Sequence, residues 1–365
     1  MTRASAWLWA MILLTVAAVA SAVALAPPAG ASPVQALSWL LFTGSSVHVA
    51  STGWLFSLPA VRAYARNHLV RCLWVPCGLV VVTAAAAGAT SPAAFAWLLL
   101  PYFGWQLFHY QKQNIGMAAL AASARRVQGL RPAERWPLLA TGSAGIASLI
   151  VRPTLLGLRI GSAGHAASVV ILLAAATFLV SAVTGTAALA RRPPAQRPAG
   201  FSAAYLIALL FFVPAFAFAS PYAAVGGLTI GHGLQYLLLV TLIASGTSAS
   251  TSGAQSSAGS TALSRLLRLA LLANVAFVGG ALLSGASHLH DARPAGRLIF
   301  GAYLGVVMAH FVIDAGIWRM RDPLARNILI THLPYLVPAK PMTAPRLVLA
   351  NAATDRSATD IECRA

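Results

Sequence analysis

Residues 166–190 read AASVVILLAAATFLVSAVTGTAALA, a stretch without a single charged side chain. A helix of about 20 apolar residues is long enough to cross the roughly 30 Å hydrocarbon core of a bilayer. The stretch is continuously apolar, whereas a strand of a membrane barrel would alternate apolar and polar residues. It therefore predicts a transmembrane helix.

Similar apolar blocks recur along the whole chain. Of its 365 residues, 58% are hydrophobic and only 9% are charged, whereas a soluble domain carries about 25% charged residues. Together with the quoted stretch, the blocks span 7–26, 36–58, 69–88, 93–112, 137–152, 166–190, 201–219, 222–246, 266–287 and 297–318. The sequence thus predicts an all-α, polytopic membrane helix bundle of about ten transmembrane helices.

The positively charged residues predict how this bundle is oriented. With the N-terminus inside, only four of the 25 Lys and Arg residues face outward: Arg152, Arg159, Arg293 and Arg297. Positive residues collect on the cytoplasmic side of membrane proteins, so both termini are predicted in the cytoplasm of a bacterial-type inner membrane. The net charge of +18 is spread over short loops rather than gathered in one domain, so no nucleic-acid partner is expected.

The polar segments predict how the chain is divided. Residues 1–318 are expected to form the transmembrane bundle and 319–365 a cytoplasmic tail. A low-complexity run at 247–262, rich in Ser, Thr, Gly and Ala, predicts a flexible cytoplasmic linker. Within the tail, the apolar run at 327–338 is expected to lie on the membrane surface. An alternative for residues 1–26 is a cleaved secretory signal, which would leave nine helices with the same orientation.

Ionisable side chains inside a membrane are costly and mark functional sites. The predicted spans contain one acidic residue, Asp314, and four histidines, which are His48, His109, His232 and His310. These histidines lie on the second, fourth, eighth and tenth predicted helices, which all run from outside to inside. At 1.5 Å per residue they lie roughly 16 to 26 Å below the outer boundary. Four imidazoles at similar depth predict a shared metal site.

Polar residues share helical faces with these histidines, since residues three or four apart lie on the same face. The pairs are Gln106 and Gln113 with His109, Gln235 and Tyr236 with His232, Asp314 with His310, and Ser51 and Thr52 with His48. We expect the three glutamines to orient imidazoles by hydrogen bonds, and Asp314 and Tyr236 to take part in catalysis.

Gly231 and Gly233 would let another helix or a flat ligand approach His232 closely. A second interpretation stays open: the polar residues could join helices without binding a ligand, and Asp314 could pair with Arg319.

The donor set narrows the chemistry of this predicted site. Imidazole with one carboxylate suits iron, copper or zinc rather than magnesium or calcium, and a carboxylate-bridged di-iron centre needs about four acidic ligands. The favoured function is a membrane-bound oxidoreductase, a non-haem iron or copper oxygenase or desaturase acting on a lipophilic small molecule among membrane lipids. With no soluble reductase domain fused, it would require a separate electron donor.

Histidines spread over several transmembrane helices resemble, in arrangement and hydropathy, the bacterial Brp/Blh carotene dioxygenases. The resemblance involves no aligned motif; it implies an iron oxygenase and assigns no individual residue. The HxxxH and HxxHH boxes of membrane desaturases and alkane hydroxylases are absent. Two alternatives remain. Paired histidines could ligate a b-type haem for electron transfer, or Asp314 and the histidines could serve a proton-coupled transporter.

Overall fold

The computed structural model describes residues 2–28, 31–161, 164–246, 258–290, 293–320 and 322–337. Within these ranges all regular secondary structure is helical, which confirms the predicted all-α class. Six helices are long and apolar enough to cross a membrane: Arg3–Ala24, Val70–Ala89, His165–Ala190, Tyr222–Ser245, Ala262–Ser287 and Pro294–Ile317. They indicate a multi-pass membrane protein. The other predicted blocks also coincide with helical residues, and the count of about ten spans stays a prediction.

The helices are numbered in chain order. The first half holds α1 (Arg3–Ala24), α2 (Gln35–Phe42), the π-helix η1 (Thr43–Val47), α3 (His48–Leu55), α4 (Pro59–Asn67), the π-helix η2 (Val70–Trp74), α5 (Val75–Ala89), α6 (Pro92–Ala124) and α7 (Pro132–Ile150). The second half holds α8 (His165–Ala190), α9 (Ala199–Leu210), α10 (Val213–Ala217), the π-helix η5 (Tyr222–Gly226), α11 (Gly227–Ser245), α12 (Ala258–Ser287), α13 (Pro294–Ile317) and α14 (Pro323–His332). Short 3₁₀ turns η3 (Pro153–Leu156) and η4 (Pro194–Gln196) follow α7 and α8.

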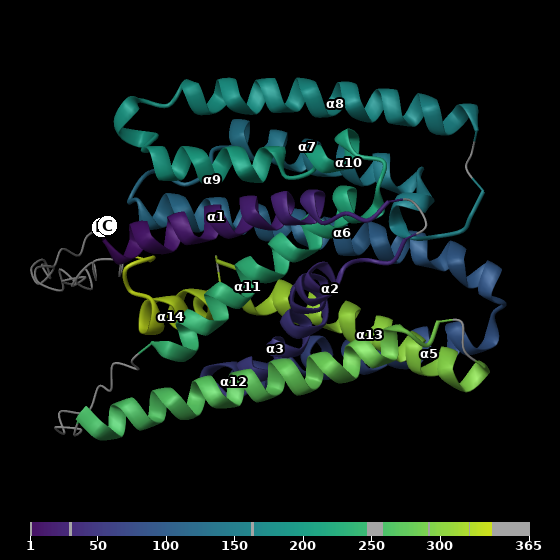
Figure 1. The fold of residues 1–365 in the computed structure, drawn as a ribbon. Coiled ribbons are helices and arrows are strands. Elements are labelled where there is room, and N and C mark those ends of the chain that lie inside the picture. Colours follow the sequence, from purple (N-terminus) through teal and green to yellow (C-terminus); the bar gives the residue numbers. More distant parts are fainter. Residues whose placement is uncertain are drawn as a thin grey trace, which may run out of the picture.

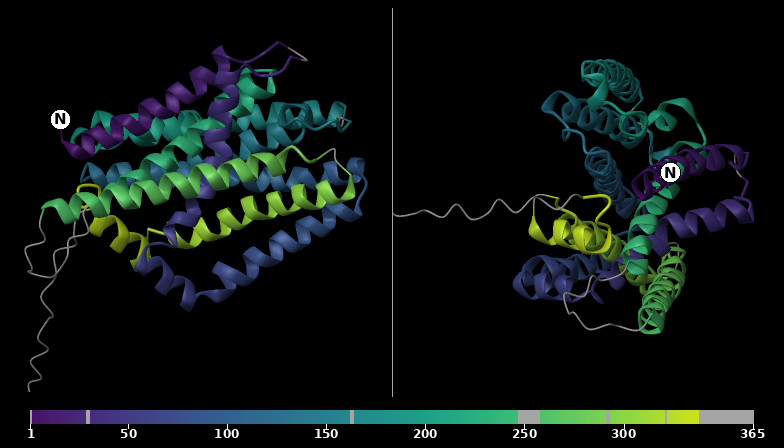
Figure 2. Two further views of the ribbon diagram at one scale, coloured as in Figure 1. Left: turned by 60° about the horizontal axis from the view of Figure 1, so that its bottom comes forward. Right: turned by 90° about the vertical axis from the view of Figure 1, so that its left-hand side faces the viewer.

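The helices form two groups around a central helix. Figure 1 shows α8 beside α7 and α9 along one edge, and α5, α12 and α13 along the opposite edge. In the end-on view of Figure 2, α11 lies between the two groups, and it packs against α1, α3, α6 and α12. The unit α2–η1–α3 crosses obliquely to the long helices (Figure 1). Residues from both groups therefore meet near α11.

The outward faces of the long helices are apolar. Leu172 on α8, Val81 on α5 and Leu282 on α12 are each more than three-fifths exposed, while several polar side chains are buried inside the bundle. Large exposed apolar surfaces of this kind suit contact with lipid tails rather than water.

The structure bears on two segments of the predicted division into bundle, linker and tail: the linker at 247–262 and the apolar run at 327–338. Helix α12 already begins at Ala258, so the end of the predicted linker is helical, and residues 247–257 lie outside the described residues. In the apolar run of the tail, Ile328 and Leu329 of α14 are buried in the main hydrophobic core, and the position of this run at the membrane surface stays a prediction. One face of α14 packs against α4 and α11, which removes its apolar side chains from solvent. Residues 338–365 of the tail lie outside the described residues.

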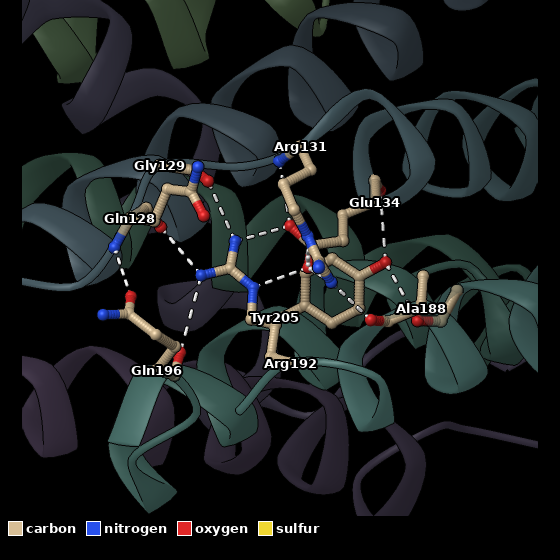
Figure 3. A network of polar contacts seen from close by, with 9 residues as sticks. Gln128, Gly129, Arg131, Glu134, Ala188, Arg192, Gln196 and Tyr205 are labelled. Atoms are coloured by element: carbon tan, nitrogen blue, oxygen red, sulfur yellow. Dashed lines mark hydrogen bonds and ion pairs between the residues drawn. The ribbon is translucent and has the colours of Figure 1, made fainter. Parts of the chain in front are cut away.

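A buried ionic network fastens the start of α7 to the end of α8 (Figure 3). The Glu134 carboxylate is fully buried and accepts hydrogen bonds from Arg192 at 2.5 and 2.6 Å and from Arg131 at 2.7, 2.9 and 3.0 Å. Arg192 also donates to the carbonyls of Gln128 and Gly129 at 2.8 and 2.9 Å. Burial by itself would raise the pKa of Glu134, but these hydrogen bonds outweigh it and hold the pKa below its ordinary value. This ionic network is well satisfied and needs no ligand.

Candidate metal centre

All four predicted histidines come together in the interior of the bundle. His48 is the first residue of α3, His109 lies in α6, His232 in α11 and His310 in α13. The ring centroids form a closed four-membered circuit: His48 to His232 is 4.9 Å, His232 to His109 is 5.0 Å, His109 to His310 is 5.2 Å and His310 to His48 is 5.0 Å. We call this group the histidine centre. No sequence neighbours contribute to it; it exists only because four helices meet.

Glycines bring two of these helices close enough to touch through their backbones. A Cβ atom on Gly233 would lie 2.3 Å from the Gly44 carbonyl oxygen of η1, and one on Gly44 would lie 2.5 Å from the Ile230 Cα. Only glycine permits such an approach. The prediction that Gly233 allows a helix near His232 is confirmed. Gly231 differs, because its nearest neighbours lie at an ordinary 3.6 Å.

The π-helix η1 directly precedes His48, with which α3 begins. A π-helical turn inserts an extra residue into a helix, and such turns are frequent at functional sites. Here the turn holds Gly44 against α11 and thereby brings the His48 ring beside His232.

Aromatic side chains cover the outside of two imidazoles. Tyr110 stacks on His232 with a centroid distance of 4.1 Å and an interplanar angle of 24°. Phe311 stacks on His109 at 4.5 Å and 27°. Because these rings hold the imidazole planes in place, the nitrogen atoms are directed by packing rather than by hydrogen bonds alone.

The ring nitrogens of the histidine centre are largely unpartnered. Both nitrogens of His48 and His232, and Nε2 of His109 and His310, are buried and have no hydrogen-bond partner among the described residues. Native proteins pair nearly all buried polar atoms, so a cluster of exceptions requires an explanation. A bound metal ion would satisfy one nitrogen of each imidazole that it contacts.

A chain of hydrogen bonds connects His310 to Asp314 through two hydroxyl groups. Tyr236 donates to Asp314 Oδ1 at 3.1 Å. Thr52 Oγ1 lies 2.8 Å from the Tyr236 hydroxyl and 2.7 Å from His310 Nδ1. Since Tyr236 gives its proton to Asp314, Thr52 must donate to Tyr236, and His310 must donate its Nδ1 proton to Thr52. In this tautomer Nε2 of His310 carries a free lone pair.

The donor atoms fall into two groups that could each hold an ion. One is made by His48, His232 and His310 and the other by His109, His310 and Asp314; within each, the candidate ligand atoms lie within 4.8 Å of one another. His310 belongs to both. Asp314 Oδ2 lies 3.6 Å from His310 Nε2, and Arg319 pairs with Asp322 instead. The alternative ion pair between Asp314 and Arg319 is therefore not formed.

The three glutamines lie beside the histidine centre but do not bond to an imidazole. Gln113 donates to the His232 backbone carbonyl at 2.8 Å and to Gln235 at 3.1 Å. Gln235 donates to Thr15 of α1 at 2.9 Å, and Gln106 donates to Tyr110 at 2.6 Å. They join helices around the site, and the expectation that they orient imidazoles stays a prediction. It is Thr52 that contacts an imidazole nitrogen, that of His310. Because the two residues lie on different helices, the sequence does not show that they are neighbours.

The comparisons with known proteins supply no relative. Neither a protein-family model, nor a curated protein, nor a solved structure matches this chain.

Proposed function

We propose that this protein is a membrane metalloenzyme whose histidine centre holds iron or copper and supports oxygenation or desaturation of a lipophilic substrate. The observation that carries the proposal is the group of unpartnered, buried nitrogens on four imidazoles whose neighbouring ring centroids lie 4.9 to 5.2 Å apart. Imidazole-rich sites of this kind suit iron, copper and zinc. The donor set therefore fits a metal, whereas the buried ionic network around Glu134 is satisfied without one.

In the proposed site, His48, His232 and His310 would hold the ion, and His109, which forms the second candidate group with His310 and Asp314, would be a further ligand. Bound iron or copper would supply the activation of dioxygen. Thr52 keeps Nε2 of His310 directed at the ion by occupying Nδ1. Asp314 and Tyr236 lie on the same side and hold a proton between the phenol and the carboxylate, where it is available to a reacting group.

The substrate class follows from the surroundings of the centre. The histidine centre is buried among apolar helices whose outer faces suit lipid, which favours a lipophilic small molecule from the bilayer as the proposed substrate. We further propose ten transmembrane helices with both termini in the cytoplasm of a bacterial-type inner membrane, on the basis of the segregated Lys and Arg residues. Electrons would come from a separate donor protein. We also propose a likeness to the Brp/Blh dioxygenases, because histidines from four separate helices meet inside the bundle.

A haem is the main competing ligand, and the packing argues against it. A porphyrin must lie flat between its two axial histidines and extend well beyond them. Here each imidazole has two imidazole neighbours at 4.9 to 5.2 Å, and Tyr110 and Phe311 cover the outer faces of His232 and His109. No flat slot for a macrocycle lies between the rings.

The test uses the purified full chain in detergent. Elemental analysis and an absorption spectrum should reveal iron or copper without a Soret band, and oxygen consumption should rise when a lipophilic substrate and a chemical reductant are supplied together. Tyr236→Phe should keep the metal and lower turnover by about 100-fold, whereas Tyr102→Phe, a buried control on α6, should not. A Soret band would replace the proposal with a haem protein. Metal-free protein that carries protons across vesicles would replace it with a transporter.

A further inference from the structure

A second site lies away from the histidine centre. A groove of about 550 Å³ opens between the end of α3, the start of α4, the first turns of α12, and α14. Its volume is in the range of small-molecule sites. It is lined by Ser57, Leu58, Pro59, Ala60, Leu267, Arg268, Leu271, Asn327, Ile328, Thr331 and His332. Figure 1 shows that α14 and the start of α12 lie at the end of the molecule where α1 begins, which is the predicted cytoplasmic end.

One part of the groove is apolar and open to the surroundings. Leu267 and Leu271 on α12 are 60% and 46% exposed, while Leu58 and Ile328 are buried. Leu267 and Leu271 lie four residues apart and so share one face of α12. In a bilayer such a strip is a surface for an acyl chain.

The other part of the groove is polar and positively charged. Arg268 donates to the Gly246 carbonyl at 2.8 Å, which fixes its guanidinium at the end of α11. Arg62, which is not a lining residue, donates at 2.7 Å to the carbonyl of Ser57, which is one. Burial, and secondly the nearby Arg268, lower the pKa of His332. None of the lining residues is acidic, and Arg268 is the arginine among them.

We propose that this groove binds an anionic phospholipid. Its phosphate would lie against Arg268, with Asn327 and Thr331 as neutral hydrogen-bonding partners, and one acyl chain would lie along Leu267 and Leu271. Charge-assisted bonds from arginine are the strong contacts to phosphate. The cytoplasmic leaflet presents anionic headgroups at the depth where basic residues gather. This site does not depend on the metal chemistry of the histidine centre.

The test titrates the purified full chain with phosphatidylglycerol and with phosphatidylcholine of the same acyl chains, and counts bound lipids by native mass spectrometry. Phosphatidylglycerol should bind the wild type more tightly than phosphatidylcholine. Arg268→Gln should weaken the binding of phosphatidylglycerol about tenfold, as expected for the loss of one charge-assisted hydrogen bond. Arg265→Gln is the matched control, because Arg265 lies three residues away on α12, is exposed, and does not line the groove; it should bind like the wild type.

A second pair of variants avoids the structural contact of Arg268 with Gly246. Asn327 is exposed in the groove. Asn327→Asp would place a negative charge beside the phosphate and should weaken the binding of phosphatidylglycerol. Asn327→Gln adds no charge and should leave this binding unchanged. Equal binding of the two lipids, or equal behaviour of the two variants in either pair, would overturn the proposal. Displacement of phosphatidylglycerol by inorganic phosphate alone would also overturn it, in favour of a site for the free anion.

Discussion

Thr52 is the residue on which the direction of His310 depends. Its hydroxyl lies 2.7 Å from His310 Nδ1 and 2.8 Å from the Tyr236 hydroxyl. Thr52→Val keeps the side-chain shape and removes both contacts. We expect it to weaken metal binding by about 10- to 100-fold, measured by competition with a chelator, while Thr52→Ser stays close to the wild type. Unchanged affinity in Thr52→Val would mean that packing alone directs the ring.

Asp314 could be either a metal ligand or a residue that positions other groups, and one substitution distinguishes the two roles. It accepts a hydrogen bond from Tyr236 at 3.1 Å, and its other oxygen lies 3.6 Å from His310 Nε2. We expect Asp314→Asn to retain most of the bound metal and to lose turnover, because the amide cannot take up the Tyr236 proton. Metal content and oxygen consumption are measured on the same sample. Complete loss of metal would instead place Asp314 among the ligands.

At the scale of the helices, the contact between α11 and the π-helix η1 sets the geometry of the histidine centre. Gly233→Ala forces a Cβ atom to within 2.3 Å of the Gly44 carbonyl oxygen, whereas Gly231→Ala meets its neighbours at 3.6 Å. Overpacking of this kind costs about 1–3 kcal/mol. Gly233→Ala should therefore lower both the thermal unfolding midpoint and the metal content, and Gly231→Ala should change neither. Equal effects of the two variants would show that the backbone contact is unimportant.

The ionic network between α7 and α8 is the second element-scale feature. Glu134→Gln leaves the buried Arg192 without its charge partner, and breaking a buried pair costs about 3–5 kcal/mol. Asp322→Asn is the control, because its pair with Arg319 at 3.9 Å is half-exposed and contributes at most about 1 kcal/mol. The two variants are compared by thermal unfolding in detergent. A smaller loss of stability in Glu134→Gln than in Asp322→Asn would contradict this assignment.

The Glu134 carboxylate should also make the stability of the folded protein depend on pH. The pKa of Glu134 is lower in the folded protein than its ordinary value of 4.5, so the folded state favours the charged form. The stabilisation is fully present above that value and is lost as the pH falls below it toward the folded pKa. The wild type should lose stability in that range more steeply than Glu134→Gln. Parallel curves for the two proteins would refute this role.

For the whole molecule, the sequence predicts which polar residues lie inside the membrane better than it predicts which helices contact one another. Hydropathy places His48, His109, His232 and His310 at one depth because bilayer thickness limits where a residue can lie. It does not show which helices are neighbours, so the contact of Thr52 with His310 and the stacking of Tyr110 on His232 were missed. These contacts depend on the π-helix and on Gly44, whose effect appears only when two helices touch.

The predicted orientation is testable on the whole chain. In a background without native cysteines, Thr154→Cys lies in the predicted outer segment and Ala63→Cys in a predicted inner one, and both positions are exposed. A membrane-impermeant thiol reagent added to intact cells should label Thr154→Cys only, because positive residues mark the inner side. Labelling of Ala63→Cys alone would reverse the orientation.

The histidine centre is most directly tested by the metal content of the purified chain. Elemental analysis should find about one ion of iron or copper per chain in the wild type, because the two candidate ligand groups share His310 and the four imidazoles carry unpartnered nitrogens. Each of His48→Ala, His109→Ala, His232→Ala and His310→Ala should bind substantially less. A wild type that contains no metal, or full metal occupancy in all four variants, would contradict the account.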